Sequence, residues 1–270
     1  MTHTGKRRPP TRDGARDNPK KSPETHPKNL ARIVGFSAVG ALFATAPDRV
    51  ERLFFDARSK ARAQDFCAAL SRARKPYREL PKEELDRVAG TPMHGGIVAV
   101  ARPRPVLRFE VEAARGWARD GRLLLVLDGI GNPHNLGAIV RTAAFFGLPR
   151  IVLSDHAQQA LPSDASYRVA EGGFEHLDLY RTGAISTQLG KLRGAYRIVG
   201  AAPQGRAAIP ARRQDGPPFA LVLGNEEAGL PQATLAACDD VAAIPGSGRI
   251  ESLNVSAAAA ILIFALNGAA

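Results

Sequence analysis

The feature that most constrains the fold of this chain is an uninterrupted apolar stretch, residues 123–127, which ends at Asp128. A strand with one solvent-facing side alternates apolar and polar residues, whereas a continuous apolar run is typical of a strand buried on both faces of a parallel sheet. Further stretches of strand length that are rich in apolar residues lie at 150–153, 196–201, 219–223 and 241–244. Stretches with helical spacing separate several of them, among them 182–193 and 252–266. The second half therefore predicts an α/β domain with a mostly parallel sheet and right-handed crossovers.

Three of the predicted strands are followed by loops rich in Gly, Asn and Ser. After the first strand come Asn132 and Asn135, with Asn135 as the predicted N-cap of a helix that carries Arg141. The other two loops read GNEEAGL over 224–230 and IPGSGRIESLNVS over 244–256. In parallel sheets, ligands bind outside the carboxyl ends of the strands. The three loops therefore predict one pocket, lined by backbone groups and small polar side chains.

Several common binding motifs are absent from the sequence. A Gly-x-Gly pair follows the first strand, but a dinucleotide-binding turn would need a third glycine where His134 stands. The chain has no Gly-Lys-Ser/Thr phosphate loop and no His-Glu-x-x-His or Cys-x-x-Cys spacing, so we expect no metal site. Cys67 and Cys238 lie far apart, which excludes a disulfide scaffold and favours a reducing, cytoplasmic location. The last apolar run, 257–266, is too short to span a bilayer, so no membrane partner is expected.

Positive charge is concentrated in the first part of the chain. Residues 1–30 hold eight Lys/Arg against three Asp/Glu, 31–120 hold seventeen against eleven, and 121–270 hold twelve of each. Five prolines and almost no large apolar residue in 1–30 predict a disordered basic arm. This distribution favours a polyanion-binding N-terminal half followed by a C-terminal half with a different function.

The stretch 31–105 has the pattern of a small α/β/α domain. The sequence predicts helices at 32–46, 58–74 and 82–88 and strands at 50–55, 77–80 and 97–100. The many Lys and Arg residues of this stretch are either the solvated face of ordinary helices or an RNA-facing patch, and the neutrality of the second half favours the patch. Two prolines at 103 and 105 indicate a domain boundary, so 106–120 is interpreted as a linker with one helix and 121–270 as the second domain.

Three motifs of the second half together resemble the SpoU/TrmH family of RNA ribose methyltransferases. NLGAIVR at 135–141 resembles the first family motif, LGNExxGL at 223–230 the second, and IPxxGxxESLNVS at 244–256 the third. They occur in the family's order and spacing. Residues 31–101 resemble the ribosomal-protein-like substrate-binding domain that often precedes this block. One departure is Gly246, where the family commonly has methionine, a change that would enlarge the wall beside the cofactor.

The resemblance implies a SPOUT-type fold with a deep trefoil knot, S-adenosyl-L-methionine held in the knot, and a homodimer with active sites at its interface. The catalytic residues that it implies are Asn135, Arg141, Glu226, Ser252 and Asn254. The cofactor-binding residues that it implies are Leu223, Gly224, Asn225, Gly229, Ile244, Pro245, Ser252 and Leu253.

Each of the polar residues in this set also has an ordinary structural role. Asn135 can cap a helix, Glu226 can be a solvated loop carboxylate, and Ser252 and Asn254 can cap the last helix. Arg141 can form a surface ion pair, although its guanidinium also suits a phosphate fork. Some mechanisms in the family make this arginine the base that takes the hydroxyl proton. Because arginine almost never deprotonates in a protein, we favour a phosphate clamp and leave the base role open.

These observations lead us to expect an S-adenosylmethionine-dependent enzyme that methylates the ribose 2′-hydroxyl of rRNA or tRNA. RNA rather than DNA follows from the hydroxyl itself, which DNA lacks. Two alternatives stay open: a non-catalytic RNA-binding or ribosome-assembly factor, and a methyltransferase of the same fold that modifies a base such as a guanine nitrogen. Cys238 precedes two aspartates and has no basic neighbour in sequence, which argues against cysteine-dependent base methylation.

Overall fold

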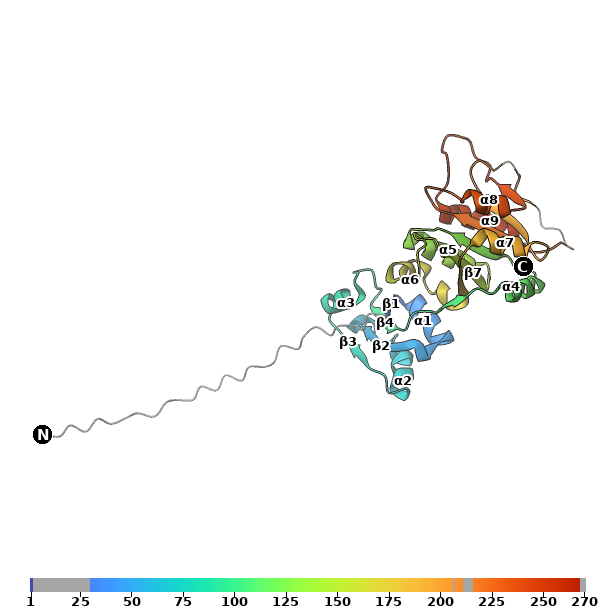
Figure 1. The fold of residues 1–270 in the computed structure, drawn as a ribbon. Coiled ribbons are helices and arrows are strands. Elements are labelled where there is room, and N and C mark those ends of the chain that lie inside the picture. Colours follow the sequence, from blue (N-terminus) through green and yellow to red (C-terminus); the bar gives the residue numbers. More distant parts are fainter. Residues whose placement is uncertain (2–29, 206, 211–215, 268–270) are drawn as a thin grey trace.

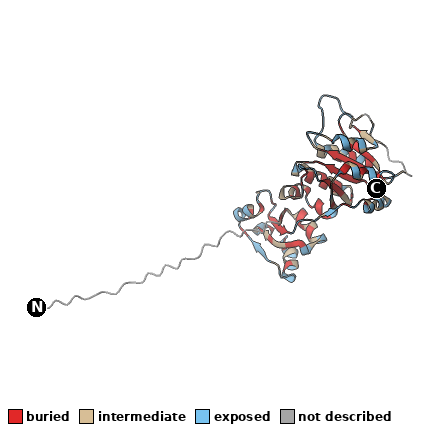
Figure 2. Cartoon of the chain, viewed as in Figure 1, coloured by how far each residue is buried: buried red, intermediate tan, exposed pale blue. Residues whose placement is uncertain are grey.

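The computed structural model describes residues 1, 30–205, 207–210 and 216–267. The predicted basic arm therefore lies outside the described residues, apart from its first and last positions. The described chain forms two sheets in two neighbouring domains, four-stranded in the N-terminal one and seven-stranded in the C-terminal one (Figure 1). Buried residues follow the strands of both sheets and the inner faces of the helices that cover them (Figure 2).

The N-terminal sheet has the strand order β1-β4-β2-β3. Its strands are β1 (Ala31–Val34), β2 (Val50–Phe55), β3 (Tyr77–Glu79) and β4 (Ile97–Ala101). Its helices are α1 (Phe36–Thr45), α2 (Gln64–Arg72) and α3 (Lys82–Ala89). β4 is buried at every residue because it lies between β1 and β2 and its alternating side chains enter two cores, Ile97 and Ala99 one and Val98 the other.

Two predicted elements of this domain need correction. The predicted helix at 32–46 is wrong at its start, because residues 31–34 form strand β1 and the helix begins at Phe36. Short runs of small and apolar residues fit either period, and pairing with β4 decides for a strand. The predicted helix at 58–74 begins only at Gln64, after a 3-10 turn in which the Asp56 carboxylate accepts a hydrogen bond from the Ser59 N–H at 2.8 Å.

The C-terminal sheet has the strand order β11-β9-β10-β6-β7-β8-β5, and every neighbouring pair of its described strands is parallel. The strands are β5 (Val106–Arg108), β6 (Leu124–Asp128), β7 (Arg150–Ser154), β8 (Asp178–Thr182), β9 (Arg197–Ala201), β10 (Phe219–Gly224) and β11 (Asp240–Ala242). The apolar run from which the parallel sheet is predicted is β6, and all its residues are buried. The predicted α/β class and the parallel sheet are confirmed, and the trefoil knot stays a prediction.

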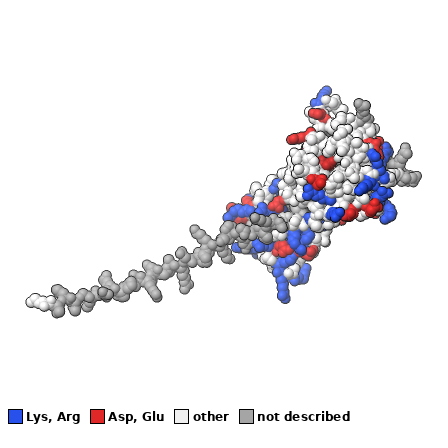
Figure 3. All heavy atoms as spheres, in the orientation of Figure 1, with Lys and Arg blue, Asp and Glu red and all other residues white. Residues whose placement is uncertain are grey.

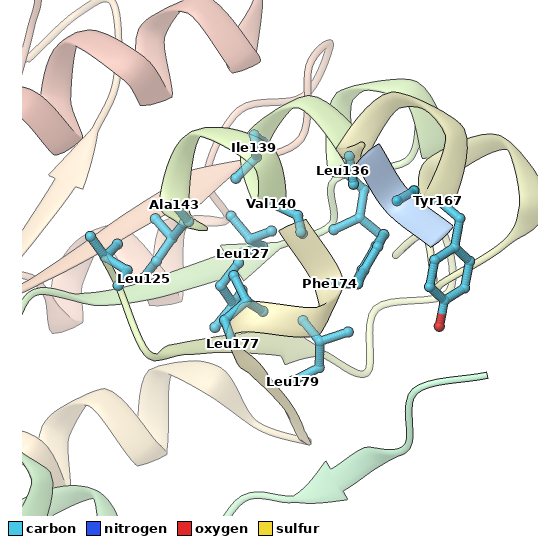
Figure 4. Packing of buried hydrophobic residues seen from close by; sticks show 14 of the residues in the cluster. Leu125, Leu127, Leu136, Ile139, Val140, Ala143, Tyr167, Phe174, Leu177 and Leu179 are labelled. Carbon is cyan, nitrogen blue, oxygen red and sulfur yellow. The ribbon is translucent and has the colours of Figure 1, made fainter. Parts of the chain in front are cut away.

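Helices cover both faces of the C-terminal sheet. The core on one face includes residues of α5 (Pro133–Phe145), α6 (Asp164–Ala170) and α9 (Val255–Asn267). The core on the other includes residues of α4 (Val111–Trp117), α7 (Ile185–Leu192) and α8 (Gln232–Ala237). Leu125 and Leu127 of β6 contribute to the first core, beneath α5 (Figure 4), and Leu124 and Val126 to the second. β6 is apolar from Leu124 to Leu127 because these residues supply both cores.

The sequence does not predict two strands of this sheet, β5 and β8. β8 reads Asp-Leu-Tyr-Arg-Thr, with polar residues at both ends, and β5 has only three residues. Because β5 pairs with β8 at the sheet edge, the first part of the predicted linker 106–120 belongs to the C-terminal sheet. Within the described ranges, no helix is long and apolar enough to cross a membrane, and no cluster of His, Cys, Asp or Glu could hold a metal ion.

Ion pairs next to α6 join the two domains. Arg49 of the N-terminal domain pairs with Glu175, and their side chains are only 10% and 1% exposed. Arg104, on the connection between the domains, binds Asp178 at 2.8 Å, and its backbone N–H donates to the Tyr167 hydroxyl at 2.7 Å. These contacts hold the N-terminal domain against the α6 side of the C-terminal domain (Figure 1).

Basic side chains gather on the N-terminal domain around α2 (Figure 3). The exposed members there include Arg72, Arg74 and Arg78. The same view shows further basic side chains near α4 of the C-terminal domain, where acidic side chains lie among them. The distribution agrees with a polyanion-binding surface on the N-terminal domain.

Candidate active site

The loops after β6 and β10 meet at one carboxylate, that of Glu226. Its Oε2 accepts a hydrogen bond from the Gly131 N–H at 3.1 Å, and its Oε1 accepts from the Asn132 N–H at 3.3 Å and from Nδ2 of Asn135 at 2.9 Å. β6 and β10 are parallel neighbours with Asp128 opposite Gly224, so their carboxyl ends deliver the two loops to the same place. The two loops therefore meet at the carboxyl ends of β6 and β10, and the pocket expected there stays a prediction.

The third loop joins them through Asn254. Its Nδ2 donates to Oδ1 of Asn135 at 3.1 Å, while its own Oδ1 accepts from the Ser256 N–H at 2.8 Å at the start of α9. Asn254 therefore caps the last helix and contacts the first motif, through Asn135, at the same time. A continuous chain, Asn254–Asn135–Glu226, links all three motif loops, and we name it the polar chain.

Asn135 is not the N-cap of α5, contrary to prediction. The helix begins at Pro133, and Oδ1 of Asn132 accepts a hydrogen bond from the His134 N–H at 2.8 Å. Proline suits the first helical position because its missing N–H is not needed there. Asn135 therefore lies in the first turn, where its amide is free of capping and joins the polar chain.

The hydrogen bonds to Glu226 set its charge state. Partial burial raises the pKa of this carboxyl, but the donors from Asn135, Gly131 and Asn132 outweigh burial and hold the pKa below its ordinary value. Hydrogen bonds to the ionised form have this effect because they stabilise the charged oxygens. Glu226 is therefore ionised at neutral pH and acts as an acceptor that ties the loops together.

We expect Glu226→Gln to loosen the site in a pH-dependent way. The folded-state pKa lies below the ordinary value, so the carboxylate contributes its full stabilisation above pH 4.5 and loses it as the pH falls through the folded-state pKa. The difference in thermal midpoint between wild type and variant should be constant from pH 6 to pH 8 and shrink below pH 4.5. Glu227→Gln on the same turn is the control, and an identical pH dependence for both variants would contradict this account.

The turn after β10 is built around Asn225. Its backbone exchanges two hydrogen bonds of 3.0 Å with Gly229, its Oδ1 accepts from the N–H groups of residues 227 and 228, and its Nδ2 donates to the Gly129 carbonyl at 2.8 Å. Gly224 leaves no room for a side chain, because a Cβ there would lie 2.5 Å from the Gly229 backbone. Of the predicted cofactor-binding positions, Asn225 and Gly229 thus shape the turn, and Leu223 and Gly224 form the buried end of β10.

Two buried residues that the sequence does not predict, Gln159 and Thr234, hold the end of β6 and the loop that follows it. The buried amide of Gln159 accepts from the Gly129 and Ile130 N–H groups at 3.0 and 3.2 Å. The Thr234 hydroxyl donates to Oδ2 of Asp128 at 2.8 Å, and both residues are buried. No spacing in the sequence signals Gln159 or Thr234, because each reaches the loop from a different strand connection.

The loop after β11 is exposed over the remaining predicted positions. Ile244 packs against the core, Pro245 and Ser252 are exposed, and the Leu253 side chain is 51% exposed. Among the described residues, none of the backbone groups of 245–253 takes part in a backbone–backbone hydrogen bond. The loop therefore presents backbone donors and acceptors, and an apolar side chain, to a ligand.

The structure does not bring Arg141 or Ser252 into the polar chain. Arg141 lies six residues after Asn135, which is about 9 Å along α5, and its Nη1 pairs with Oε1 of Glu171 at 3.1 Å. No hydrogen bond within the described residues joins Ser252 to another member of the site. The predicted catalytic set thus divides into a connected group of three and two exposed residues, Arg141 and Ser252.

Cys238 does not have the properties of a catalytic nucleophile. Burial and the neighbouring Asp239 raise the pKa of its thiol to about 11. A thiol with so high a pKa carries almost no thiolate at neutral pH. This observation agrees with the sequence argument against cysteine-dependent base methylation.

A small basic α/β domain precedes a parallel α/β domain with the polar chain at its strand ends, and both parts match families of RNA methyltransferases. Residues 122–264 match the model of the SpoU rRNA Methylase family, and residues 32–107 match the domain described as RNA 2′-O ribose methyltransferase substrate binding. The chain belongs to the SpoU rRNA methylase family. The resemblance found from the three motifs is confirmed.

Several relatives share most of this chain. The 23S rRNA (guanosine-2′-O-)-methyltransferase RlmB of Acinetobacter baylyi is 32% identical over 234 residues, covering 85% of this chain and 94% of the relative. The protein of the same name from Nitrosomonas europaea is 33% identical over 239 residues, covering 86% and 89%. A solved putative RNA methyltransferase of the TrmH family from Porphyromonas gingivalis has a TM-score of 0.63 at 26% identity, covering 87% and 88%. An AdoMet-bound rRNA methyltransferase from Sinorhizobium meliloti, 21% identical with a TM-score of 0.69 and covering 88% and 87%, shares the fold.

Proposed function

We propose that this protein transfers a methyl group from S-adenosylmethionine to the ribose 2′-hydroxyl of ribosomal RNA. The observation that carries the proposal is the polar chain, because Asn135, Glu226 and Asn254 come from three motifs far apart in sequence and meet at hydrogen-bond distance. RlmB relatives act on guanosine of 23S rRNA, which favours rRNA over tRNA and guanosine over the other nucleosides. A cytoplasmic location is proposed with this substrate.

The loops after β10 and β11 fit S-adenosylmethionine. The Arg249 N–H donates to the Ser247 hydroxyl oxygen at 3.4 Å, and the other backbone groups of 245–253 suit the polar edge of an adenine and a ribose, while the half-exposed Leu253 suits the ring face. Leu223, Gly224, Asn225, Gly229, Ile244, Pro245, Ser252 and Leu253 would hold it. When bound, the cofactor supplies an electrophilic methyl group on its sulfonium, so the protein needs no metal for this chemistry.

Glu226, Arg141 and Ser252 have different proposed roles in the reaction with RNA. Glu226 keeps the loops together and, with its lowered pKa, is a weak proton acceptor. Arg141 presents an exposed guanidinium at the site edge and would hold a phosphate beside the target ribose. Ser252 carries an exposed hydroxyl without a hydrogen-bond partner in the described chain, so it is free to bind the reacting hydroxyl.

We propose residues 31–105 as the RNA-recruiting domain, with 106–120 connecting it to the methyltransferase domain 121–270. The exposed arginines around α2 provide counter-charges for RNA phosphates, and the arm 1–30 adds further positive charge in the sequence. The binding of RNA by this domain should weaken steeply as salt concentration rises.

We propose that two copies of the chain associate through α5 and α9. Phe145 and Phe264 are 82% and 72% exposed, and both pack against Phe146, with ring centroids 5.1 and 6.1 Å apart. Large exposed aromatic patches mark interaction sites. α5 carries Asn135 and Arg141, so a partner on this face would lie next to the active site.

We expect Phe264→Asp to convert the dimer into monomers at micromolar concentration, because burying a carboxylate without a partner is costly. Sedimentation velocity would measure the change. Met93→Asp, which changes an equally exposed residue of the other domain, is the control. A wild-type monomer at these concentrations would count against the proposed interface.

The test of the proposed function is methyl transfer from radiolabelled S-adenosylmethionine to RNA from cells that lack this protein. The labelled RNA is digested and the modified nucleoside is identified. A 2′-O-methylated guanosine from 23S rRNA is the expected product. A base-methylated nucleoside would overturn the chemistry, and no label with folded protein and rRNA supplied would favour a non-catalytic RNA-binding factor.

A further inference from the structure

Residues 171–177 connect α6 to β8, and the first five of them, the turn 171–175, have an unusual backbone. Glu171 ends α6 in the left-handed conformation, with φ 46° and ψ 42°, and Gly172 follows at φ 95°. A non-glycine residue in this region of the Ramachandran plot is uncommon and costs conformational energy. Phe174 anchors the turn in the core, with its ring tilted against that of Tyr167 at a centroid distance of 4.7 Å (Figure 4). The turn is therefore held in place by packing, and the strained position carries a carboxylate.

This turn contacts α5 at Arg141. A Cβ on Gly173 would lie 3.1 Å from both the Arg141 Cα and the Val140 carbonyl oxygen, so the two backbones are in close contact. From the same turn, Oε1 of Glu171 reaches Nη1 of Arg141 at 3.1 Å. Both the backbone and the guanidinium of Arg141 are thus in contact with residues 171–173.

The opposite side of the turn contacts the N-terminal domain. The Ser37 hydroxyl donates to the Glu171 carbonyl oxygen at 3.3 Å, and a Cβ on Gly172 would lie 2.9 Å from the Ala41 Cβ of α1. At the other end of the turn, Glu175 forms the buried ion pair with Arg49. One short segment therefore touches the domain proposed to recruit RNA and the arginine proposed to bind it.

We propose that Glu171 is a positioning residue for Arg141. The turn 171–175 determines the position of the Arg141 guanidinium relative to RNA bound by the N-terminal domain. The inference rests on the proposed function. Exposed ion pairs contribute little to stability, and the Arg141 and Glu171 side chains are 57% and 50% exposed, so stability does not account for a carboxylate at a strained position. By binding Nη1, Glu171 limits the rotamers of Arg141 and leaves its other N–H groups free for a phosphate.

The test compares Glu171→Gln and Glu171→Asp with the wild-type full-length protein in the methyl-transfer assay with rRNA. We expect Glu171→Gln to lower kcat by on the order of tenfold to a hundredfold, because small misplacements of a positioning group cost this much. The KM for RNA, the affinity for S-adenosylmethionine and the thermal midpoint should stay near the wild-type values. Glu171→Asp retains the charge and should recover part of the lost kcat.

Glu110→Gln is the matched control, because Glu110 and Arg108 form an exposed ion pair of 2.9 Å in the same domain. A wild-type kcat for Glu171→Gln would overturn the proposal, as would an effect confined to KM. A faster reaction would also overturn it, because Glu171 would then compete with the RNA phosphate for Arg141. Failure of the proposed function itself is distinguishable, since the wild-type protein would then label no RNA.

Discussion

Arg141→Ala is expected to lower kcat for methyl transfer by on the order of 10²–10³-fold, the range measured when one preorganised electrostatic contact to a transition state is removed. The side chain reaches the site edge from α5 and is exposed, so truncation removes the phosphate contact without leaving a cavity. The affinity for S-adenosylmethionine, measured by calorimetry, should change little, because no hydrogen bond or ion pair among the described residues joins the Arg141 side chain to the loops proposed to hold the cofactor.

Arg141→Lys separates charge from geometry. A lysine keeps the positive charge but lacks the planar fork that binds a phosphate through two N–H groups. Its kcat should therefore fall between those of the wild type and the alanine variant. A wild-type kcat for Arg141→Ala would refute the proposed phosphate contact of Arg141. Ser252 and the polar chain would then be the candidates for positioning the substrate.

Glu175→Ala is expected to have the largest effect on stability, lowering the free energy of unfolding by about 3–5 kcal/mol, the range for breaking one partner of a buried ion pair. The Glu175 and Arg49 side chains are 1% and 10% exposed, and Arg104 adds a second cation at 3.8 Å. Removing the carboxylate leaves a charged guanidinium buried between the domains without its partner. The midpoint of urea unfolding, followed by tryptophan fluorescence and by circular dichroism, measures the loss.

Asp178→Ala is the control for this substitution. Asp178 also forms an ion pair with Arg104, which lies on the connection between the domains. Because the Asp178 side chain is 46% exposed, its removal should lower the free energy of unfolding by only about 0–1 kcal/mol. Equal losses for the two variants would show that burial does not determine the strength of this interface.

The sequence predicts the parallel sheet well because the apolar run 123–127 contributes side chains to a core on each face of the sheet. It fails where a short segment takes its structure from a distant partner. β1 becomes a strand only because β4 lies beside it, and β5 has three residues at the edge of a sheet built mostly from the second half. Local spacing carries no information about such partners.

In the candidate site, too, the sequence predicts the residues that belong to motifs and fails for those that depend on distant contacts. Asn135, Glu226 and Asn254 are predicted through the motifs, and the structure joins them because parallel strand ends meet at one edge. Gln159 is not predicted, because its amide acts on loop N–H groups 29 and 30 residues away and its sequence neighbours are unremarkable. The contact between Arg141 and Glu171 likewise depends on the left-handed turn after α6.

Through the polar chain, the candidate active site depends on α9, the last helix among the described residues. Asn254 reaches back 119 residues to Asn135, and Asn267 at the other end of α9 donates to the Phe146 carbonyl 121 residues earlier. Contacts between such distant residues form late, because loop closure must precede them. During translation the active site is therefore incomplete until α9 has left the ribosome and packed on α5. A protein that we propose to modify ribosomal RNA thus becomes competent only after its own ribosome has translated the segment up to residue 267.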